Sequence, residues 1–430
     1  MTKNKIIAKS TSNVDTKCVL PLIHLHTWPN KDVYACCLGN INHQVGSLKN
    51  NTLKEIWNDD PMRKIRRTML AGERPPECVN CFKEEDTGNE SFRITSARDF
   101  APHMKKWDDV KEDGTLDEMD LAYWDFRFSN VCNFSCRSCG PQLSTGWYGD
   151  TKKIWGGLPP DLPEKGRVFE LWEQIEPYFP IVEKIYFAGG EPLMMEEHYR
   201  IINRLVEMGR TDVHLIYNSN LSQFFYKKQN ILDSWGKFDR VTMAASLDGY
   251  GPRGEFVRTG LDWQKWVNNR LEMKQKTPKV EFNINSTVSI QNVFHMPDFF
   301  RELMRQGLID HPHCFHINLV HHPFWLNVGI LHPTKKQLID KLYTDWEEDL
   351  LTNYKPAWRT ETLVRHIQGF KKFMWSQEFN PKMLERFILE MERIDAVRDQ
   401  TWQEEIPEMA DIDPDWTIKR IKKQDPFIYE

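Results

Sequence analysis

The sequence lacks a long apolar run, a secretory signal and an excess of basic charge, and each absence excludes a class of protein. No uninterrupted apolar stretch reaches the roughly 18 residues of a membrane span, so we expect no membrane partner. The segment MTKNKIIAKSTSN lacks the apolar centre and cleavage site of a secretory signal, which predicts a cytoplasmic protein. The net charge is -5 and no basic domain or arm occurs, so we expect no nucleic-acid partner.

Cysteine, by contrast, is present in a number that needs an explanation, since the chain has nine. Disulfides are rare in a reducing cytoplasm, so grouped cysteines indicate ligands of a metal or a cluster. Cys314 stands alone, and the other eight form two groups. The first group is Cys18, Cys36, Cys37, Cys78 and Cys81, and the second is Cys132, Cys136 and Cys139.

Alternation of short β-rich runs with longer amphipathic segments predicts the fold class, which is α/β. Six units of this kind over about 200 residues favour a partial (β/α)6 barrel of the TIM type over a closed eightfold barrel. The expected strands are 123–128, 184–187, 213–217, 241–246, 280–284 and 315–320.

The pattern also predicts how the 430 residues are divided. Residues 15–95 carry the early cysteines and form a small N-terminal domain, with a helix from Asp60 to about Gly72. The barrel occupies 119–325, after a polar linker at 102–118. Residues 333–430 form a helical C-terminal extension, in which Asn380 and Pro381 cap and open one helix.

The second cysteine group, Cys132-Asn-Phe-Ser-Cys136-Arg-Ser-Cys139, directly follows the first expected barrel strand. Three thiolates can hold a cubane cluster and leave one iron open for a cofactor, as catalytic metals keep a free position. The alternative is a zinc knuckle completed by a remote His or Cys. The spacing C-x3-C-x2-C is not an ordinary zinc spacing, which favours the cluster.

This loop resembles the cluster loop of the radical SAM superfamily, whose cofactor is S-adenosylmethionine (SAM). Three later stretches match the family in order, each directly after an expected strand. Each stretch alone could be an ordinary turn, so their joint order carries the resemblance. They are Gly189-Gly190-Glu191-Pro192, which resembles the GGEP element, Ser219-Asn220, and Ser246-Leu247-Asp248-Gly249, which resembles the SLDG element of the peptide-modifying branch.

The resemblance implies which residues bind SAM. The GGEP element would meet the SAM amino group, Ser219 and Asn220 the ribose, and Arg258, in the stretch EFVRTG, the SAM carboxylate. Ser246 and Asp248 would complete the set. One departure concerns the residue before the third cysteine, which is often aromatic in the family and is Ser138 here, with Phe134 elsewhere in the loop.

The first cysteine group can close a second cluster, and zinc competes with it evenly on spacing alone. The stretches CVLPLIHLHTWPNKDVYACCLGN and AGERPPECVNC resemble the SPASM/twitch auxiliary-cluster domain, here placed before the barrel as in twitch domain-containing radical SAM proteins. The stretch MERIDAVRDQTWQEEIPE resembles the C-terminal segment of that group. The implied ligands of a second [4Fe-4S] cluster are Cys18, Cys36, Cys78 and Cys81, with Cys37 as an alternative to Cys36.

The resemblance implies an enzyme that cleaves SAM reductively at a [4Fe-4S] cluster on the catalytic Cys132, Cys136 and Cys139. A 5′-deoxyadenosyl radical would then take hydrogen from a substrate, with flavodoxin or ferredoxin as the reductant. The favoured substrate is a peptide or protein side chain, and a sugar- or nucleotide-type small molecule is the alternative. A non-catalytic iron–sulfur or zinc electron-transfer scaffold is the rival from another class.

Overall fold

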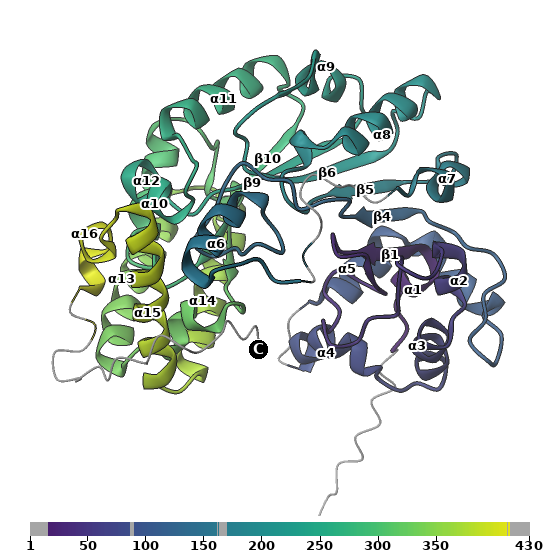
Figure 1. The fold of residues 1–430 in the computed structure, drawn as a ribbon, viewed down its shortest axis with the longest axis horizontal. Coiled ribbons are helices and arrows are strands. Elements are labelled where there is room, and N and C mark those ends of the chain that lie inside the picture. The colour runs from purple at the N-terminus through teal and green to yellow at the C-terminus, as the bar shows by residue number, and fades with distance from the viewer. Residues whose placement is uncertain (1–15, 87–89, 161, 163–169, 411, 413–430) are drawn as a thin grey trace, which may run out of the picture. The chain divides into compact units, whose positions relative to one another are not determined.

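The structure is a computed structural model that describes residues 16–86, 90–160, 162, 170–410 and 412. The chain divides into two compact units, which are described separately (Figure 1). The N-terminal unit comprises Met1–Phe126 and Glu170–Glu183. The C-terminal unit comprises Arg127–Phe169 and Lys184–Glu430. The boundaries at 15–95, 119–325 and 333–430 stay a prediction.

The N-terminal unit contains a small mixed sheet in the order β4-β1-β2-β3, in which β4 runs parallel to β1 and the other pairs are antiparallel. Its strands are β1 (His24–Thr27), β2 (Asp32–Tyr34), β3 (Gly46–Ser47) and β4 (Tyr123–Phe126). Its helices are α1 (Leu20–Ile23), α2 (Leu53–Trp57), α3 (Asp60–Leu70), η1 (Pro76–Cys78), α4 (Val79–Asp86), α5 (Phe92–Asp99), η2 (Ala101–Asp109), α7 (Trp172–Ile175) and η4 (Glu176–Tyr178).

Local sequence explains the short helices of this unit. Thr52 and Glu55 form a capping box at the start of α2, in which each residue's side chain accepts the other's backbone amide hydrogen. The predicted helix from Asp60 is confirmed as α3. The polar segment at 102–118, predicted to be a linker or an excursion, contains the 3-10 helix η2 in its first half, where Trp107 is buried at 3% exposure.

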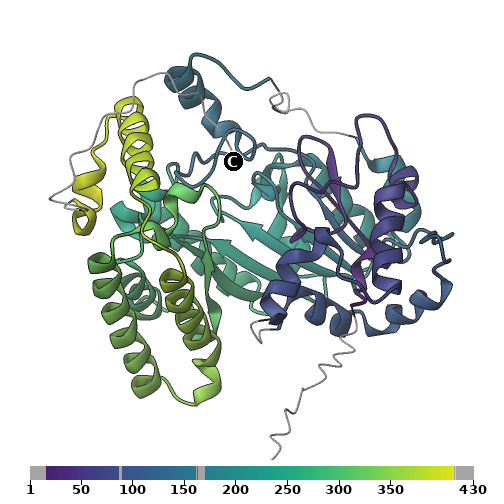
Figure 2. The same cartoon turned by 90° about the horizontal axis from the view of Figure 1, so that it is seen from below.

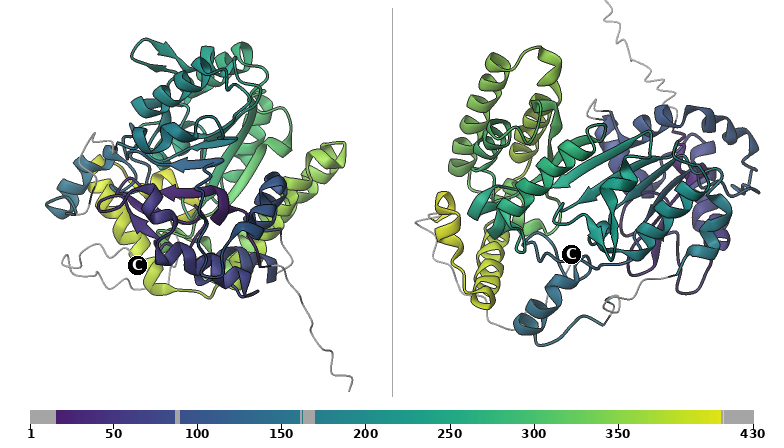
Figure 3. Two further views of the ribbon diagram at one scale, coloured as in Figure 1. Left: turned by 90° about the vertical axis from the view of Figure 1, so that its right-hand side faces the viewer. Right: turned by 90° about the horizontal axis from the view of Figure 1, so that it is seen from above.

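The C-terminal unit contains five parallel strands in the order β11-β10-β9-β6-β5 (Figure 3). They are β5 (Lys184–Phe187), β6 (His214–Ser219), β9 (Val241–Ser246), β10 (Glu281–Val288) and β11 (Phe315–Leu319), and a small hairpin adds β7 (Phe225–Tyr226) and β8 (Gln229–Asn230). The accompanying helices are η3 (Thr145–Trp147), α6 (Tyr148–Trp155), η5 (Pro192–Met194), α8 (Glu196–Glu207), α9 (Ile231–Trp235), α10 (Gly251–Val257), α11 (Trp263–Lys276), α12 (Met296–Arg305), η6 (Pro312–Cys314), η7 (Phe324–Leu326) and η8 (Val328–Ile330).

The last part of this unit is helical (Figure 2). Its helices are α13 (Pro333–Asn353), η9 (Ala357–Arg359), α14 (Glu361–Ser376), α15 (Pro381–Arg398), α16 (Trp402–Glu405) and η10 (Pro407–Met409). The Asn380 side chain accepts the Met383 amide hydrogen at 3.1 Å, so the predicted cap of α15 is confirmed. α13 packs against α14, and α14 packs along β11.

The predicted α/β class, with parallel strands between helices and a helical C-terminal region, is confirmed. All six expected strands occur, with bounds that differ by a few residues at their ends. The first of them, β4, belongs to the N-terminal unit, because it pairs in parallel with β1 there. Among the residues that the structure describes, none of the helices combines the length and the apolar character needed to cross a membrane.

Candidate active site

The three cysteines of the C-terminal unit lie on the cysteine loop, defined here as residues 132–139, which forms neither helix nor strand. The loop is held by the segment that follows α10. The Ser135 amide donates to the Thr259 carbonyl and the Arg137 amide donates to the Val257 carbonyl, both at 2.8 Å. The middle of the loop therefore has backbone partners 120 or more residues away, and its shape depends on tertiary contacts.

Cys132 lies at the start of the loop and faces the end of β6. Its Sγ accepts the Phe134 amide hydrogen at 3.4 Å, and the side-chain amide of Asn220 lies 3.9 Å from it. The same Asn220 group donates to Asn133 Oδ1 at 2.9 Å. Burial raises the pKa of Cys132 to about 12. Residues 219–220 and the first cysteine are thus brought together, as the resemblance implies.

Cys136 and Cys139 interact with each other through their thiols. The hydrogen bond from Cys139 and, to a smaller extent, the Arg258 guanidinium together lower the pKa of Cys136 to about 7, against the effect of burial. Arg258 Nη1 lies 3.9 Å from Cys136 Sγ. The pKa of Cys139 is raised by the same pairing. Cys136 is therefore the loop's readiest thiolate, the form in which cysteine ligates metals.

The two glycines after β5 let this turn approach residues 129–131, which lead into the cysteine loop, closely. The Gly190 amide donates to the Ser129 carbonyl at 3.3 Å, and the Glu191 amide donates to the Val131 carbonyl at 2.7 Å. A Cβ on Gly190 would lie 2.2 Å from the Val131 carbonyl oxygen. Gly189 has φ of 124°, in the region that favours glycine. Glycine at these positions therefore serves the backbone contact with the segment 129–131 that leads into the loop.

Glu191 is buried, at 1% exposure, and joins the GGEP element to the end of β6. One carboxylate oxygen accepts the Ser219 hydroxyl hydrogen and the other accepts the Asn220 amide hydrogen, both at 2.7 Å. The Leu193 amide donates to the carboxylate at 3.1 Å. Burial raises the pKa of Glu191 to about 7, although these donors oppose the shift. Pro192 follows as the buried first residue of η5.

Asp248 and Arg258 connect the end of β9 to the cysteine loop. Arg258 Nε lies 2.8 Å from Asp248 Oδ2, and the other carboxylate oxygen accepts the Thr287 amide hydrogen at 2.7 Å. Asp248 is 1% exposed, so this is a buried ion pair. Ser246 lies at the end of β9, in register with Asn285 of β10, and within the part of the chain that the structure describes its hydroxyl makes no hydrogen bond to the other site residues.

The sequence interpretation missed several residues that hold the loop. Thr145 Oγ1 lies 3.3 Å from the Cys132 amide nitrogen, and Asn133 pairs with Asn220. Phe134 is 1% exposed and packs near Gly260, so it belongs to the core of the loop. Only Asn133 and Phe134 carried a signal, since they stand within the cysteine motif.

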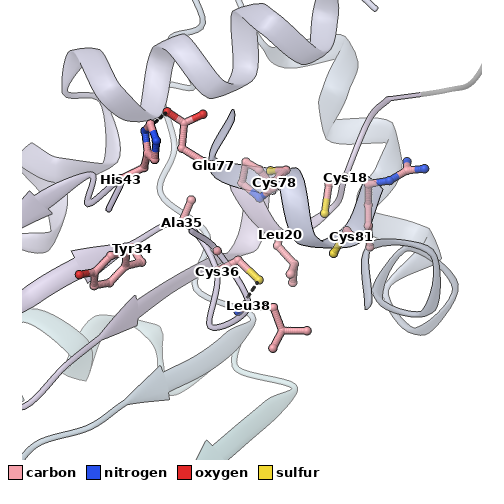
Figure 4. A pocket seen from close by; sticks show the side chains of 13 residues that line it. Cys18, Leu20, Tyr34, Ala35, Cys36, Leu38, His43, Glu77, Cys78 and Cys81 are labelled. Carbon is pink, nitrogen blue, oxygen red and sulfur yellow. Dashed lines mark hydrogen bonds and ion pairs between the residues drawn. The ribbon is translucent and has the colours of Figure 1, made fainter. Parts of the chain in front are cut away.

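The N-terminal unit holds a second site, a cavity lined by Cys18, Cys36, Cys78 and Cys81 (Figure 4). Figure 4 shows their sulfur atoms around one space. The described residues that line this cavity include Cys36 and not Cys37. The backbone amides that follow Cys36 hold this residue in place. The Leu38 amide donates to Cys36 Sγ at 3.4 Å, and the Gly39 amide donates to the Cys36 carbonyl at 3.0 Å.

The surroundings of this cavity fit a group that binds thiolates. Burial raises the pKa of Cys18 to about 12 and also raises the pKa values of Cys78 and Cys81. Such thiols ionise only with a positive partner, which a metal or cluster supplies. Arg93 adds a guanidinium that donates to the Lys17 carbonyl beside Cys18 at 2.8 Å. No set of three or more His, Cys, Asp or Glu side chains in the described ranges is spaced to hold a single metal ion.

Comparison with known families identifies this site. The SPASM family, an iron-sulfur cluster-binding domain, matches residues 18–82. Residues 18–82, here called the SPASM domain, are therefore similar to this family. The match covers all five early cysteines and confirms the SPASM part of the resemblance. The SPASM domain here precedes the parallel strands of the C-terminal unit in the chain.

Solved structures give weaker similarities. Native anSMEcpe with bound AdoMet is 17% identical at a TM-score of 0.37, over 53% of this chain and 61% of that one. Streptococcus suis SuiB bound to the precursor peptide SuiA is 13% identical at a TM-score of 0.36, over 66% of this chain and 62% of that one. The chain thus spans about three fifths of each structure's length, and TM-scores this low do not show a shared fold. No curated protein matches the chain.

Proposed function

We propose that this chain is a radical SAM enzyme, which cleaves SAM reductively at a [4Fe-4S] cluster on the cysteine loop. One observation carries the proposal. The loop, the GGEP element and the Ser-Asn element are joined by contacts between Cys132 and Asn220 and between Glu191 and Ser219. Arg258 joins the SLDG element to the loop, since it contacts both Asp248 and Cys136. These elements gather after the carboxyl ends of parallel strands, where active sites of βα folds lie.

The loop residues fit such a cluster. Cys132, Cys136 and Cys139 are the three thiolate donors, and the lowered pKa of Cys136 favours the thiolate form that ligates a metal. When bound, a cubane with one open iron supplies the one-electron reduction of SAM that generates a 5′-deoxyadenosyl radical. The protein supplies placement and the exclusion of water.

The remaining site residues orient SAM in this proposal. Arg258 carries a positive charge beside Cys136 and suits the SAM carboxylate, while Asp248 holds its guanidinium in place. The half-buried turn at Gly189 and Gly190, which has no side chains in the way, suits the SAM amino group. Glu191 acts by holding Ser219 and Asn220 toward the ribose, since both its oxygens are already engaged by them.

A row of polar side chains on the parallel sheet supports a hydrogen-bonding substrate. The Asn218 side-chain amide donates to the Tyr186 hydroxyl, and the Asn285 amide donates to Asn218 Oδ1 at 3.1 Å. The hydrogen bond between Asn218 of β6 and Asn285 of β10 passes over the intervening strand β9. Asn218 is in register there with Ala244, whose side chain is small. All three polar side chains are half-buried. Such a row suits a peptide backbone or side chain, the favoured substrate, and a sugar or nucleotide would use it similarly.

The SPASM domain is proposed to hold a second [4Fe-4S] cluster on Cys18, Cys36, Cys78 and Cys81. Their convergence on one cavity supports this set. This cluster would exchange an electron with the substrate radical or ligate the substrate. A flavodoxin or ferredoxin is the proposed source of the electron for the first cluster.

The test is SAM cleavage by anaerobically reconstituted protein with dithionite. We expect 5′-deoxyadenosine from the wild type and none above background from the variant Cys132→Ala/Cys136→Ala/Cys139→Ala. Cys314→Ala is the matched control, because Cys314 lies outside both cysteine groups, against His311. Product from the triple variant at the wild-type level would contradict the cysteine loop as the site of cleavage, and no product from either protein would favour a non-catalytic iron–sulfur scaffold.

A further inference from the structure

Arg137, the residue after Cys136 in the cysteine loop, is a buried guanidinium held by the C-terminal helices. It is 1% exposed. Its Nη2 donates to Asp395 Oδ1 at 2.5 Å and to Gln400 Oε1 at 2.7 Å. The guanidinium lies 3.8 Å from the ring centre of Phe256 in α10. The loop is therefore tied, at its central cysteine, to a segment more than 250 residues later in the chain.

Arg398 makes a second tie to the same loop from the end of α15. Its guanidinium donates to the Ser135 carbonyl at 2.8 Å, to Thr259 Oγ1 at 2.7 Å and to Asp150 Oδ2 at 2.9 Å. It also lies 4.8 Å from the ring centre of Trp147. One side chain thus connects the loop, the segment that holds the loop, and α6. α15 also packs against α6 along the helix.

Asp395 extends the arrangement to α16. One of its carboxylate oxygens accepts a hydrogen bond from the Arg137 guanidinium, and the other accepts the Trp402 amide hydrogen at 2.6 Å. Asp399 ends α15 in the left-handed region, with φ of 54°, so the chain turns there. The turn brings Gln400 back to Arg137. These residues fall within the stretch MERIDAVRDQTWQEEIPE.

The two arginines act on the residues that flank Cys136. Arg398 binds the carbonyl of Ser135, before this cysteine, and Arg137 follows it. The loop has no regular secondary structure over 132–139, so its shape is set by such contacts. Guanidinium groups suit this task, since each offers several donors in one fixed plane.

We propose that Arg137 and Arg398 are positioning residues through which α15 and α16 hold the cysteine loop in the shape that brings its thiols together. Neither arginine touches a ligand in this account. The inference rests on the proposed function only for the identity of the group that the thiols bind. The shape of the loop can be measured without that group.

The first experiment is hydrogen–deuterium exchange on the full-length protein without cluster. The amides of Ser135 and Arg137 are hydrogen-bonded to residues 257–259, so their exchange reports the loop's shape. Arg398→Ala is expected to speed exchange in the peptide covering 132–139 by at least about tenfold. The peptides of β6 and β9 should keep their wild-type rates.

Arg393→Ala is the matched control on the same helix. Arg393 pairs with Glu390, also in α15, at 2.9 Å, and this variant should leave exchange of the loop unchanged. Arg398→Lys retains the charge with fewer donors in a different geometry, and should restore only part of the protection. Unchanged loop exchange in Arg398→Ala would overturn the proposal. So would an equal rise in the loop and in β6 and β9, or an equal rise in the loop in Arg393→Ala.

A second readout separates this inference from the proposed function. After anaerobic reconstitution and reduction, the electron paramagnetic resonance spectrum with SAM should differ in line shape between Arg398→Ala and Arg393→Ala, at matched iron content. A spectrum of Arg398→Ala identical to the wild type would overturn the positioning role. If the wild type itself shows no SAM-dependent signal, the proposed function fails, while the exchange experiment still decides the role of Arg398.

Discussion

Arg258 lies between a buried carboxylate and a cysteine, with Nε 2.8 Å from Asp248 Oδ2 and Nη1 3.9 Å from Cys136 Sγ. The carboxylate holds the orientation of the guanidinium, and the guanidinium lowers the pKa of Cys136. The pair therefore couples the end of β9 to the cysteine loop. Removing either partner should affect both the stability and the thiol chemistry of the site.

The first prediction concerns this pair. Arg258→Met should lower the free energy of unfolding by about 3–5 kcal/mol, because it leaves the Asp248 carboxylate buried without its cation. The double variant Arg258→Met/Asp248→Asn should cost less than the sum of the two single changes. Urea unfolding of all four proteins completes the cycle. Strictly additive effects would show that the two groups are not coupled.

The second prediction concerns Gly190. Gly190→Ala should prevent the turn from approaching the loop, since the new Cβ would lie 2.2 Å from the Val131 carbonyl oxygen. We expect a loss of several kcal/mol in stability, on the order of 3 kcal/mol or more. Gly149→Ala, in α6, meets no atom within 4 Å and should be neutral or stabilise by about 0.5–1 kcal/mol. Thermal unfolding that ranks the two variants equally would contradict this account.

The parallel strands and α15 could be predicted because their signals are local. Runs of β-rich residues predicted β5 and β9 with the bounds that the structure has, and Asn380 predicted its cap. The strands β1 to β3 were missed: β2 and β3 have only three and two residues, too few to show an alternating pattern, and β1 directly follows α1. The link from Arg137 to Asp395 could not be predicted, since a single sequence carries no signal for a pair 258 positions apart. The motif order predicted which residues gather, but not that Glu191 would bind Ser219 and Asn220.

The third prediction separates the two adjacent cysteines. Cys36 lines the cavity with Cys18, so Cys36→Ala should remove the auxiliary cluster and lower the iron content by about four atoms per chain. Cys37→Ala should keep the wild-type iron content. Iron and sulfide analysis after anaerobic reconstitution checks both variants. Loss of iron in Cys37→Ala alone would reverse the assignment.

The fourth prediction concerns acid lability. Burial lowers the pKa of His198 from 6.5 to about 3, and this ring, 1% exposed, bonds the Tyr217 hydroxyl at 2.9 Å. As pH falls, His198 is therefore protonated in the unfolded chain before it is protonated in the folded protein. Its contribution to the free energy of unfolding is complete above pH 6.5 and is lost as pH drops from 6.5 toward about 3. Near pH 5 the loss from this residue should be about 2 kcal/mol. His198→Gln should remove that part of the pH dependence in urea titrations near pH 7.5 and pH 5. An unchanged slope in the variant would contradict the buried neutral ring.

The most direct test of the central claim asks which cysteine site cleaves SAM. Reconstituted Cys136→Ala and Cys81→Ala proteins are compared with the wild type for 5′-deoxyadenosine formed per chain in the presence of SAM and dithionite. The account predicts background product from Cys136→Ala, which loses a donor of the cysteine loop, and clear product from Cys81→Ala, which alters only the SPASM cavity. Product from Cys136→Ala at the wild-type level would contradict it.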